Sequence, residues 1–428
     1  MADSKGMTSQ PSGRHESVVI GGGPAGATCA TLLARQGHRV LLLERSKFPR
    51  HHIGESLMPN TYFVFQKLGI LDKMKRSGFV PKESVQFVSA SGKDSAPFFF
   101  RDRDPNEWSV TWQVSRDKFD QMMLDHARES GVEVVEQAVV REVLFEKDRA
   151  VGVRAMIGGQ VRDIPAPVTV DASGQAGLIS RQLMLRYGDE MLKNAVIYSY
   201  WRNAQRDEGR NAGATLVIAL PGREGWFWFI PLEDDITSIG VVAPPSYLYN
   251  GRGDDPGAIL DEEIANTSGL ARRLASATRI RPVYTTADFS YRSRRAAGHG
   301  WVLIGDAFGF LDPLYSSGVM LALKSGDMAA TAIHEALAAG DVSEARLGRF
   351  GPLLAEGMQR IRMLVYAYYD PSFSMGRFVA ENPHLKDAIT RVLIGDVFDD
   401  DLADLFGTMG RRLKLPEAIK VEDAVPAR

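Results

Sequence analysis

The chain has 428 residues, 44% of them hydrophobic, which is enough for a large core and for more than one domain. Lys and Arg total 51 against 53 for Asp and Glu, so the formal net charge of -2 gives no reason to expect a nucleic-acid partner. The single cysteine, Cys29, excludes an internal disulfide and a metal site built from cysteines, and we expect no metal.

Residues 1–16 are polar and contain no apolar stretch of signal-peptide length, so we expect a flexible N-terminal arm rather than a secretion signal. No segment of the sequence approaches the ~18 consecutive apolar residues of a membrane span. Together with the lone cysteine, these features favour a protein of the reducing cytoplasm.

The first predicted unit is a strand, a helix and a second strand. An apolar run over residues 17–20 enters a glycine-rich turn, and residues 24–36 are typical of a helix that Gly37 ends. Residues 39–44 then form a mostly apolar run that ends in an acid, as a buried parallel strand does. This order predicts a βαβ unit at the front of an α/β fold.

The turn in this unit contains Gly21, Gly23 and Gly26 in the G-x-G-x-x-G spacing of a dinucleotide site. Gly21 permits the tight turn, Gly23 lets the backbone approach a pyrophosphate, and Gly26 lets the helix pack close to the strand. The helix start, with Ala25, supplies free N–H groups and a partial positive charge. Glu44 ends the second strand where an acid would bond a ribose hydroxyl. A glycine turn that binds nothing is the alternative.

After the first βαβ unit, the sequence pattern changes from that of an antiparallel sheet to that of helices. Alternation with aromatic residues, Gly and Pro over about 198–244 predicts an antiparallel sheet, and the sequence from Val342 onward is typical of helices. The other predicted helices and buried strands are, in order, residues 116–130, 132–135, 139–155, 168–171, 301–305 and 317–338.

Two later segments resemble segments of the glutathione-reductase-like FAD-binding flavoproteins. Residues 169–174 (TVDASG) are similar to the D-A-x-G segment of that class, and residues 303–307 (LIGDA) to its G-D-A segment, in the same order. The resemblance implies an α/β fold with a Rossmann-like FAD-binding domain of the glutathione-reductase-2 type. It also implies cofactor contacts from Arg45, Arg50, Arg116, Asp171, Gly305 and Asp306. A surface salt bridge is the alternative for Arg50 and Arg116.

Residues 225–231 (GWFWFIP) contain a W-x-W-x-I-P motif that resembles the signature of FAD-dependent halogenases, a branch of this class. In a strand, Trp226 and Trp228 lie on one face because side chains alternate with a period of two. The family role of these tryptophans is to keep the organic substrate away from the flavin, so that a halide is oxidised instead. Two core tryptophans in a strand are the alternative.

Residues 310–318 (FLDPLYSSG) resemble the F-x-x-P-x-x-S-x-G segment of the halogenases. The resemblance implies a cofactor contact at Pro313 and halide binding by the backbone of Ser317 and Gly318, at a helix start that favours an anion. A serine that caps a helix without binding a halide is the alternative.

A third match concerns Lys82, which follows the G-E-S segment of residues 54–56 at the spacing of the pyrrole and phenol halogenases. The resemblance implies that this catalytic lysine meets hypohalous acid and activates it or forms a haloamine. Desolvation would lower the pKa of such an amine and expose its lone pair. Lys73 and Lys75 are rivals for the role, and a solvated loop lysine is the alternative.

These resemblances predict FADH2-dependent halogenation of an electron-rich phenol or pyrrole through hypohalous acid, with O2 and chloride or bromide as co-substrates. Tryptophan halogenases carry a glutamate before the Ser-Thr-Gly part of the halide segment, where this chain has Tyr315 and Ser316, so free tryptophan is not the expected substrate. The small aromatic substrate is either free or attached to an acyl carrier protein. Since there is no second G-x-G-x-x-G, we expect a separate NAD(P)H-dependent flavin reductase to supply electrons.

Two other classes of function remain open. An FAD-dependent aromatic hydroxylase or prenyl-chain reductase would keep the FAD segments without needing the two tryptophans, the halide segment and Lys82 together. A regulatory flavoprotein would bind FAD and form no halogenated product. For any of these, we expect an FAD-binding domain from residues 17–190 and 280–340, a substrate layer at 191–279 and a helical region at 341–428.

Overall fold

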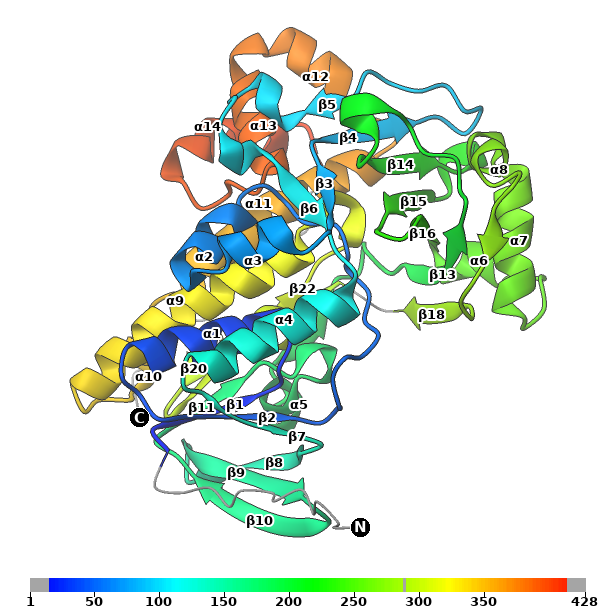
Figure 1. Cartoon of the computed structure of the whole chain (residues 1–428). Helices are drawn as coiled ribbons and strands as arrows, with labels where there is room; N and C mark the ends of the chain where they lie inside the picture. The colour runs from blue at the N-terminus through cyan, green and yellow to red at the C-terminus, as the bar shows by residue number, and fades with distance from the viewer. Residues whose placement is uncertain (1–14, 288–289, 414–428) are drawn as a thin grey trace, which may run out of the picture.

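The computed structural model describes residues 15–287 and 290–413, so residues 1–14 of the predicted arm lie outside the described residues. A mainly parallel sheet forms the centre of the lower half of the molecule (Figure 1). Its strands are buried on both faces, which explains the continuous apolar runs of β1 and β2. Their order is β20 (Ala297–Gly298), β21 (Trp301–Leu303), β11 (Val168–Asp171), β1 (Ser17–Ile20), β2 (Val40–Glu44) and β7 (Glu133–Glu136), with only the β20–β21 pair of this order antiparallel.

Helices cover one face of this sheet, and a small antiparallel sheet covers the other (Figure 1). Helix α1 (Pro24–Arg35) packs against α4 (Arg116–Glu129) and α9 (Gly318–Ala338). A Cβ atom on Gly326 of α9 would lie 2.6 Å from the carbonyl oxygen of Ala25, so glycine is required for this close approach. The opposite layer consists of β8 (Val139–Glu146), β9 (Arg149–Ile157) and β10 (Gln160–Pro165).

A second, mostly antiparallel sheet forms the right-hand part of Figure 1. Side chains of strand β15 (Trp226–Pro231) alternate between the two faces of this sheet. Phe227 and Phe229 pack with the helices that cover one face, and Trp226 and Trp228 lie on the other face. The strand order is β17 (Thr278–Arg279), β13 (Ala195–Arg202), β16 (Ile236–Ala243), β15 (Trp226–Pro231), β14 (Thr215–Ala219), β4 (Ser84–Val88) and β5 (Phe98–Phe99), with β18 (Tyr284–Ala287) paired to β13. The covering helices are α6 (Pro245–Leu248), α7 (Pro256–Asn266) and α8 (Ser268–Arg273).

Shorter elements connect the two sheets, and most of the C-terminal helices lie in the upper part of Figure 1. The connecting elements are α2 (Thr61–Leu68), α3 (Leu71–Arg76), β3 (Val80–Lys82), β6 (Thr111–Gln113), α5 (Leu178–Gln182), β12 (Arg186–Gly188), β19 (Tyr291–Ser293) and β22 (Gly309–Phe310). The C-terminal helices are α10 (Glu344–Leu347), α11 (Gly351–Tyr369), α12 (Met375–Glu381), α13 (Lys386–Leu393) and α14 (Ala403–Gly410).

The long predicted helices and the buried strands are confirmed, with ends that differ by a residue or two. The second sheet departs from the sequence prediction because β4 and β5 join it from a distant part of the chain, and helices α6–α8 interrupt the range 191–279. Strand β18, which lies in the predicted FAD-binding range 280–340, also pairs with β13 of this sheet.

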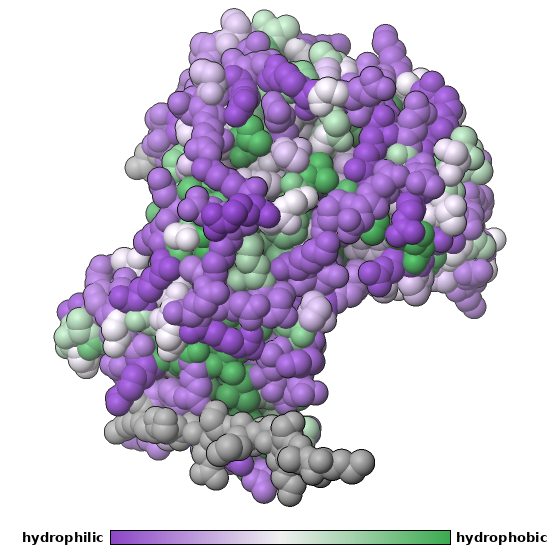
Figure 2. All heavy atoms as spheres, in the orientation of Figure 1, coloured by the Kyte–Doolittle hydropathy of each residue, from purple (hydrophilic) through white to green (hydrophobic). Residues whose placement is uncertain are grey.

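Charged and polar side chains cover most of the face seen in Figure 2, and apolar ones gather in small patches near its middle. Within residues 15–287 and 290–413, no helix is both long enough and apolar enough to cross a bilayer. The long apolar helix α9 is covered instead by α1, α2 and α10.

Candidate active site

A cavity of about 700 Å³ lies at the carboxyl ends of the parallel strands. Its wall includes residues that end or follow four of these strands, namely Ile20, Glu44, Ala172 and Ile304, and it continues to the tryptophan face of β15. Ligands of parallel α/β sheets bind at this edge. The cavity therefore lies where the sequence predicts the cofactor.

The glycine-rich turn forms one end of this cavity. Gly21 has a φ of +104°, and a Cβ atom there would lie 2.4 Å from the carbonyl oxygen of Ala172. A Cβ atom on Gly26 would lie 2.0 Å from the carbonyl oxygen of Gly21, so helix and turn touch backbone to backbone. A Cβ atom on Gly23 would meet only the Arg50 side chain, at 3.7 Å, which leaves open space where a pyrophosphate is expected.

Two helix N-termini face the cavity. Pro24 and Ala25 of α1 line it, as do Gly318 and Val319 of α9. Neither helix has an acidic residue in its first turn. The free N–H groups and the partial positive charge of both helices can therefore act on an anionic ligand.

Two acids also line the cavity. The Glu44 carboxylate accepts hydrogen bonds from the N–H groups of Gly22 (2.7 Å) and Ser46 (2.8 Å), which hold it at the end of β2. Asp306 follows Gly305, whose φ is +56°, and burial raises the pKa of the Asp306 carboxyl to about 6. Both side chains are placed to meet hydroxyl groups of a bound nucleotide.

Arg116 belongs to a buried ion cluster rather than to a surface salt bridge. Its guanidinium donates to both carboxylate oxygens of Asp120 (2.8 and 3.0 Å) and to the carbonyl oxygen of Ile53 (2.6 Å). Arg50 Nη1 lies 3.0 Å from the same Asp120 carboxylate. Two guanidinium groups share one carboxylate, so the cavity wall carries a net positive charge here.

Glu55 also lines the cavity, although it was not predicted to be a site residue. Its carboxylate accepts a 2.6 Å hydrogen bond from the Tyr200 hydroxyl, and burial raises its pKa to about 7. A carboxyl group that titrates near neutral pH is suited to proton transfer. Its place beside Ser56 in the G-E-S segment is the sequence signal that could have found it.

Trp226 and Trp228 form a fixed aromatic wall, with ring centroids 6.4 Å apart. The Trp226 indole N–H donates to the Tyr369 hydroxyl (2.8 Å), and that of Trp228 donates to Ser238 Oγ (3.1 Å). The Trp228 ring also covers Gly240, where a Cβ atom would lie 2.4 Å from the indole. Hydrogen bonding and packing therefore hold both rings in place.

The predicted halide segment turns sharply beside the cavity before α9 begins. Ser316 has a left-handed φ of +59° and lines the cavity together with Pro313 and Gly318. The carboxylate of Asp312 supports this turn by accepting the backbone N–H two residues further on (3.0 Å). Ser317 is buried behind the wall, so Gly318 and Ser316 are the residues that meet the cavity.

Lys82 is enclosed beside the cavity rather than solvated in a loop, with only 1% of its surface exposed. Its Nζ donates to Ser56 Oγ (2.8 Å) and to the carbonyl oxygen of Leu57 (2.9 Å), and burial lowers the pKa of the amine to about 7. Ser56 and Thr215 line the cavity, and their hydroxyl groups lie 2.8 Å apart. The rival lysines of α3 form ion pairs at the surface.

Four predicted site residues lie behind the cavity wall: Gly26, Lys82, Asp171 and Ser317. The Asp171 carboxylate accepts the N–H groups of Ser173 (3.0 Å) and Ile179 (2.8 Å), so it shapes the loop that lines the cavity. The predicted residues that line the cavity directly are Gly21, Gly23, Ala25, Glu44, Arg45, Arg50, Arg116, Trp226, Trp228, Gly305, Asp306, Pro313 and Gly318.

This arrangement fits FAD. The space at Gly23, the N-terminus of α1 and the guanidinium groups of Arg50 and Arg116 suit a pyrophosphate. Glu44 and Asp306 suit nucleotide hydroxyls, and the far end of the cavity has the apolar walls that a flavin ring requires. When bound in reduced form, FAD supplies the electrons that activate O2.

Comparison with known proteins finds relatives that cover most of the chain. Residues 16–103 and 101–375 match the family model described as tryptophan halogenase. The chain is 31% identical over 415 residues to a 1H-pyrrole-2-carbonyl-(peptidyl-carrier protein) chlorinase of Pseudomonas fluorescens, covering 92% of each chain. It is 33% identical over 395 residues to the corresponding brominase of Pseudoalteromonas luteoviolacea, covering 90% of this chain and 93% of that one.

The fold comparison gives the same result. The solved structure of the flavin-dependent brominase Bmp2 superimposes with a TM-score of 0.83 at 30% identity, covering 94% of this chain and all of that one. The sequence match spans well over half of the chain, and the fold match spans nearly all of it. The chain belongs to the FAD-dependent halogenase family, whose members are flavoprotein oxidoreductases that use reduced FAD, O2 and a halide ion.

Proposed function

We propose that this halogenase acts on an electron-rich pyrrole carried as an acyl group on a carrier protein. The two relatives named for pyrrole-2-carbonyl carrier proteins each cover at least 90% of this chain, which supports this substrate. The halide segment has Tyr315 where tryptophan halogenases place a glutamate. A pyrrole needs less assistance in losing its ring proton than a less activated ring does.

In this proposal, the halide lies at the start of α9. Gly318 faces the cavity there, and the helix N-terminus favours an anion. Since Ser317 is buried behind this wall, Gly318 rather than Ser317 would meet the halide. The paired indoles of Trp226 and Trp228 would keep the bulky acyl substrate away from this part of the cavity, whereas hypohalous acid is small enough to pass.

The single observation that carries the proposal is the enclosed Lys82 amine, joined to the cavity through Ser56. A neutral amine has two N–H groups and one lone pair. Its hydrogen bonds to Ser56 and Leu57 occupy N–H groups, so the lone pair is left for hypohalous acid. Attack of this lone pair on the halogen of hypohalous acid would form an N–halogen bond and break the oxygen–halogen bond. The released hydroxide would take a proton from the amine and leave as water.

The electrons would come from a separate NAD(P)H-dependent flavin reductase. The glycine-rich turn at Gly21 is the sole G-x-G-x-x-G in the sequence, and it belongs to the flavin cavity. Reduced FAD would therefore arrive from a partner enzyme, or a partner would reduce it in place.

Product mass spectrometry tests this function. The protein would be supplied with FAD, a flavin reductase, NADH, O2 and either chloride or bromide. The substrates would be a pyrrole-2-carbonyl carrier protein, the matching free acid and a set of phenols. A halide isotope pattern on the carrier-bound pyrrole alone is the expected result. Gain of a single oxygen atom would mean a hydroxylase, and halogenation of free phenols alone would contradict the tethered substrate.

A further inference from the structure

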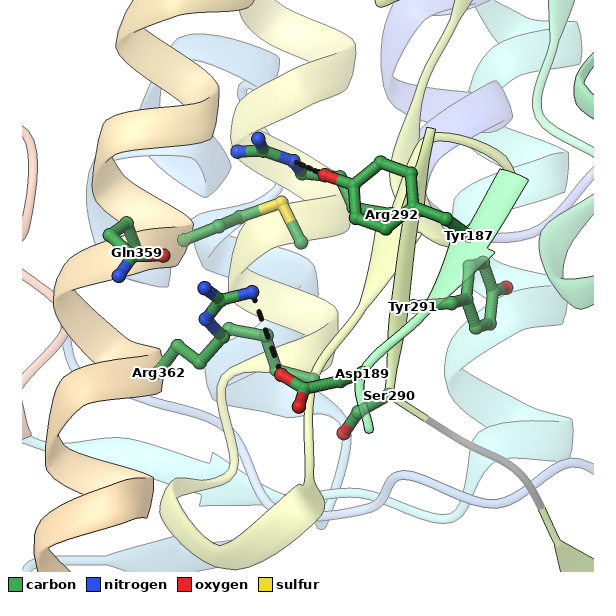
Figure 3. Close-up of a pocket in the computed structure, with 9 residues that line it drawn as sticks. Tyr187, Asp189, Ser290, Tyr291, Arg292, Gln359 and Arg362 are labelled. Carbon is green, nitrogen blue, oxygen red and sulfur yellow. Dashed lines mark hydrogen bonds and ion pairs between the residues drawn. The ribbon is translucent and has the colours of Figure 1, made fainter. Parts of the chain in front are cut away.

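A second, smaller cavity lies between the β12–β19 strand pair and helix α11 (Figure 3). It shares no lining residue with the flavin cavity. The polar residues that line it include Arg292 of β19, Arg362 of α11, Tyr187, Asp189 and Ser290. The halogenase chemistry proposed above uses none of them.

The two arginines are buried but incompletely bonded. Arg292 is 8% exposed and Arg362 is 7% exposed. Among the described residues, Arg292 Nη2 has no hydrogen-bond partner, and neither do Nε and Nη2 of Arg362 or Oγ of Ser290. Leaving a buried polar group unpaired destabilises the folded protein, and the loss is larger when the group is charged. Several such atoms around one cavity indicate a ligand that accepts hydrogen bonds.

The charges around the cavity favour an anion. Arg292 Nε donates to the Tyr187 hydroxyl (2.8 Å), and within residues 15–287 and 290–413 its guanidinium forms no ion pair. Arg362 Nη1 lies 3.5 Å from Asp189, whose carboxylate also accepts a 2.6 Å hydrogen bond from Tyr366. Two buried guanidinium groups and one carboxylate thus line the cavity, and Figure 3 shows both arginines in the space between the helix and the strands. One further negative charge would balance them.

The size of the cavity limits this anion. Its volume is about 20 Å³, roughly the room required by one or two water-sized bodies. We propose that this cavity binds a single halide ion, chloride or bromide, between the guanidinium groups of Arg292 and Arg362. The site does not depend on the identity of the organic substrate or on the role of Lys82.

A halide ion in this cavity would bind residues of both α11 and the β12–β19 strand pair and so stabilise the contact between them. Arg362 lies one turn before Tyr366, which bonds Asp189, and two turns before Tyr369. The Tyr369 hydroxyl accepts the Trp226 indole N–H. The ion would therefore stabilise the helix that supports the tryptophan wall, so it is a structural halide distinct from the one that is oxidised.

Bromide-soaked crystals of the FAD-loaded protein provide the direct test. Anomalous diffraction should show a bromide peak between Arg292 and Arg362 in addition to any peak near α9. A peak near α9 alone, or a tetrahedral ion or a water molecule between the two arginines, would overturn the proposal.

Thermal melting gives a second readout that does not depend on activity. At constant ionic strength, replacing gluconate with chloride should raise the melting temperature of the FAD-loaded protein saturably, by about 2–4 °C. Arg362→Gln should reduce this rise to the part that comes from halide bound at the start of α9. Arg360→Gln is the matched control, because Arg360 is buried in the same helix but donates to the carbonyl oxygens of Val397 and Asp399.

This control is expected to melt at a lower temperature yet keep the chloride response. A response of wild-type size in Arg362→Gln, or a response that is reduced equally in both variants, would contradict the site. If Arg362→Gln does not fold, Arg292→Gln serves in its place with the same expected reduction.

Discussion

Gly23 and Gly26 belong to one motif but have different physical roles. A methyl group on Gly23 would point into open space 3.7 Å from Arg50, whereas one on Gly26 would lie 2.0 Å from a backbone oxygen. We therefore expect Gly23→Ala to leave the melting temperature of the FAD-free protein unchanged and to weaken FAD binding at least about tenfold. Titration of FAD followed by flavin fluorescence measures this affinity.

The matched variant is Gly26→Ala. Because its methyl group would overlap the Gly21 carbonyl, it should destabilise the FAD-free protein by about 1–3 kcal/mol or prevent folding. Equal loss of stability in the two variants would mean that Gly23 is a packing glycine and that the open space beside it binds no phosphate.

Lys82 predicts a pH dependence of stability. Unfolded lysine keeps its proton up to about pH 10.5, whereas burial lowers the pKa of the folded amine to about 7. Between pH 7 and pH 10.5, unfolding therefore takes up a proton at Lys82. As the pH falls through this range, the free energy of unfolding decreases by about 1.4 kcal/mol per pH unit. Thermal melts should show Lys82→Met more stable than the wild type at pH 7, by a margin that narrows towards pH 10.

Lys75→Met provides the control, since Lys75 is exposed on α3 and paired with Glu107. Its stability relative to the wild type should not change between pH 7 and 10. A constant margin for Lys82→Met across this range would show that the buried amine is charged in the folded protein, against the role proposed for its lone pair.

At this scale, spacing in the sequence identifies many candidate residues but not their orientation. The motif positions of Gly23, Glu44 and Gly318 place them at the cavity, because the strand and helix ends that carry them are local features. Asp171 and Ser317 occupy motif positions too. The Asp171 carboxylate, however, accepts a backbone N–H instead of lining the cavity, and Ser317 is buried. Which way a side chain turns depends on neighbours that are distant in sequence.

At the level of secondary structure, the contact between strands β15 and β16 holds the Trp228 ring in position. Gly240 of β16 pairs with Trp228, and a Cβ atom on Gly240 would lie 2.4 Å from the indole. Gly240→Ala should displace the Trp228 ring, lower stability by about 1–3 kcal/mol and reduce the share of NADH consumption that yields halogenated product. Melting curves, tryptophan fluorescence and product yield together measure this.

Gly188→Ala is the corresponding control on strand β12, where a Cβ atom would meet nothing within 4 Å. It should leave the product yield unchanged. If Gly240→Ala folds with an unchanged yield, the position of the Trp228 ring does not govern the fate of the oxidised halide.

Elements with a regular period, such as α1, α9 and β15, could be predicted from the sequence because their apolar pattern is local. Helices α6–α8 were not predicted, although Asp255 caps α7 by accepting the N–H of Gly257 (2.8 Å) and Pro256 follows it. The pairing of β4 with β14 could not be predicted, because it joins segments more than a hundred residues apart and leaves no periodic signal.

The whole molecule assembles its site from separate parts. The parallel sheet supplies the glycine turn and the acids, the second sheet supplies the tryptophan wall, and α9 supplies an N-terminus. FAD would contact several of these parts at once and bind the folded state alone. At an FAD concentration 100 times its Kd, we expect about 2.7 kcal/mol of stabilisation, seen as a higher melting temperature. No change on adding FAD would contradict the assignment of the cavity.

The central claim is that oxidation of the halide and halogenation of the substrate occur at different places, joined through Lys82. The most direct measurement compares the wild type with Lys82→Met in two assays: halogenation of the carrier-bound pyrrole and halogenation of a soluble trap for free hypohalous acid. The variant should lose at least about 10²-fold in substrate halogenation and still halogenate the trap with normal FAD binding. A Lys82→Met enzyme that halogenates the substrate at the wild-type rate would contradict the account.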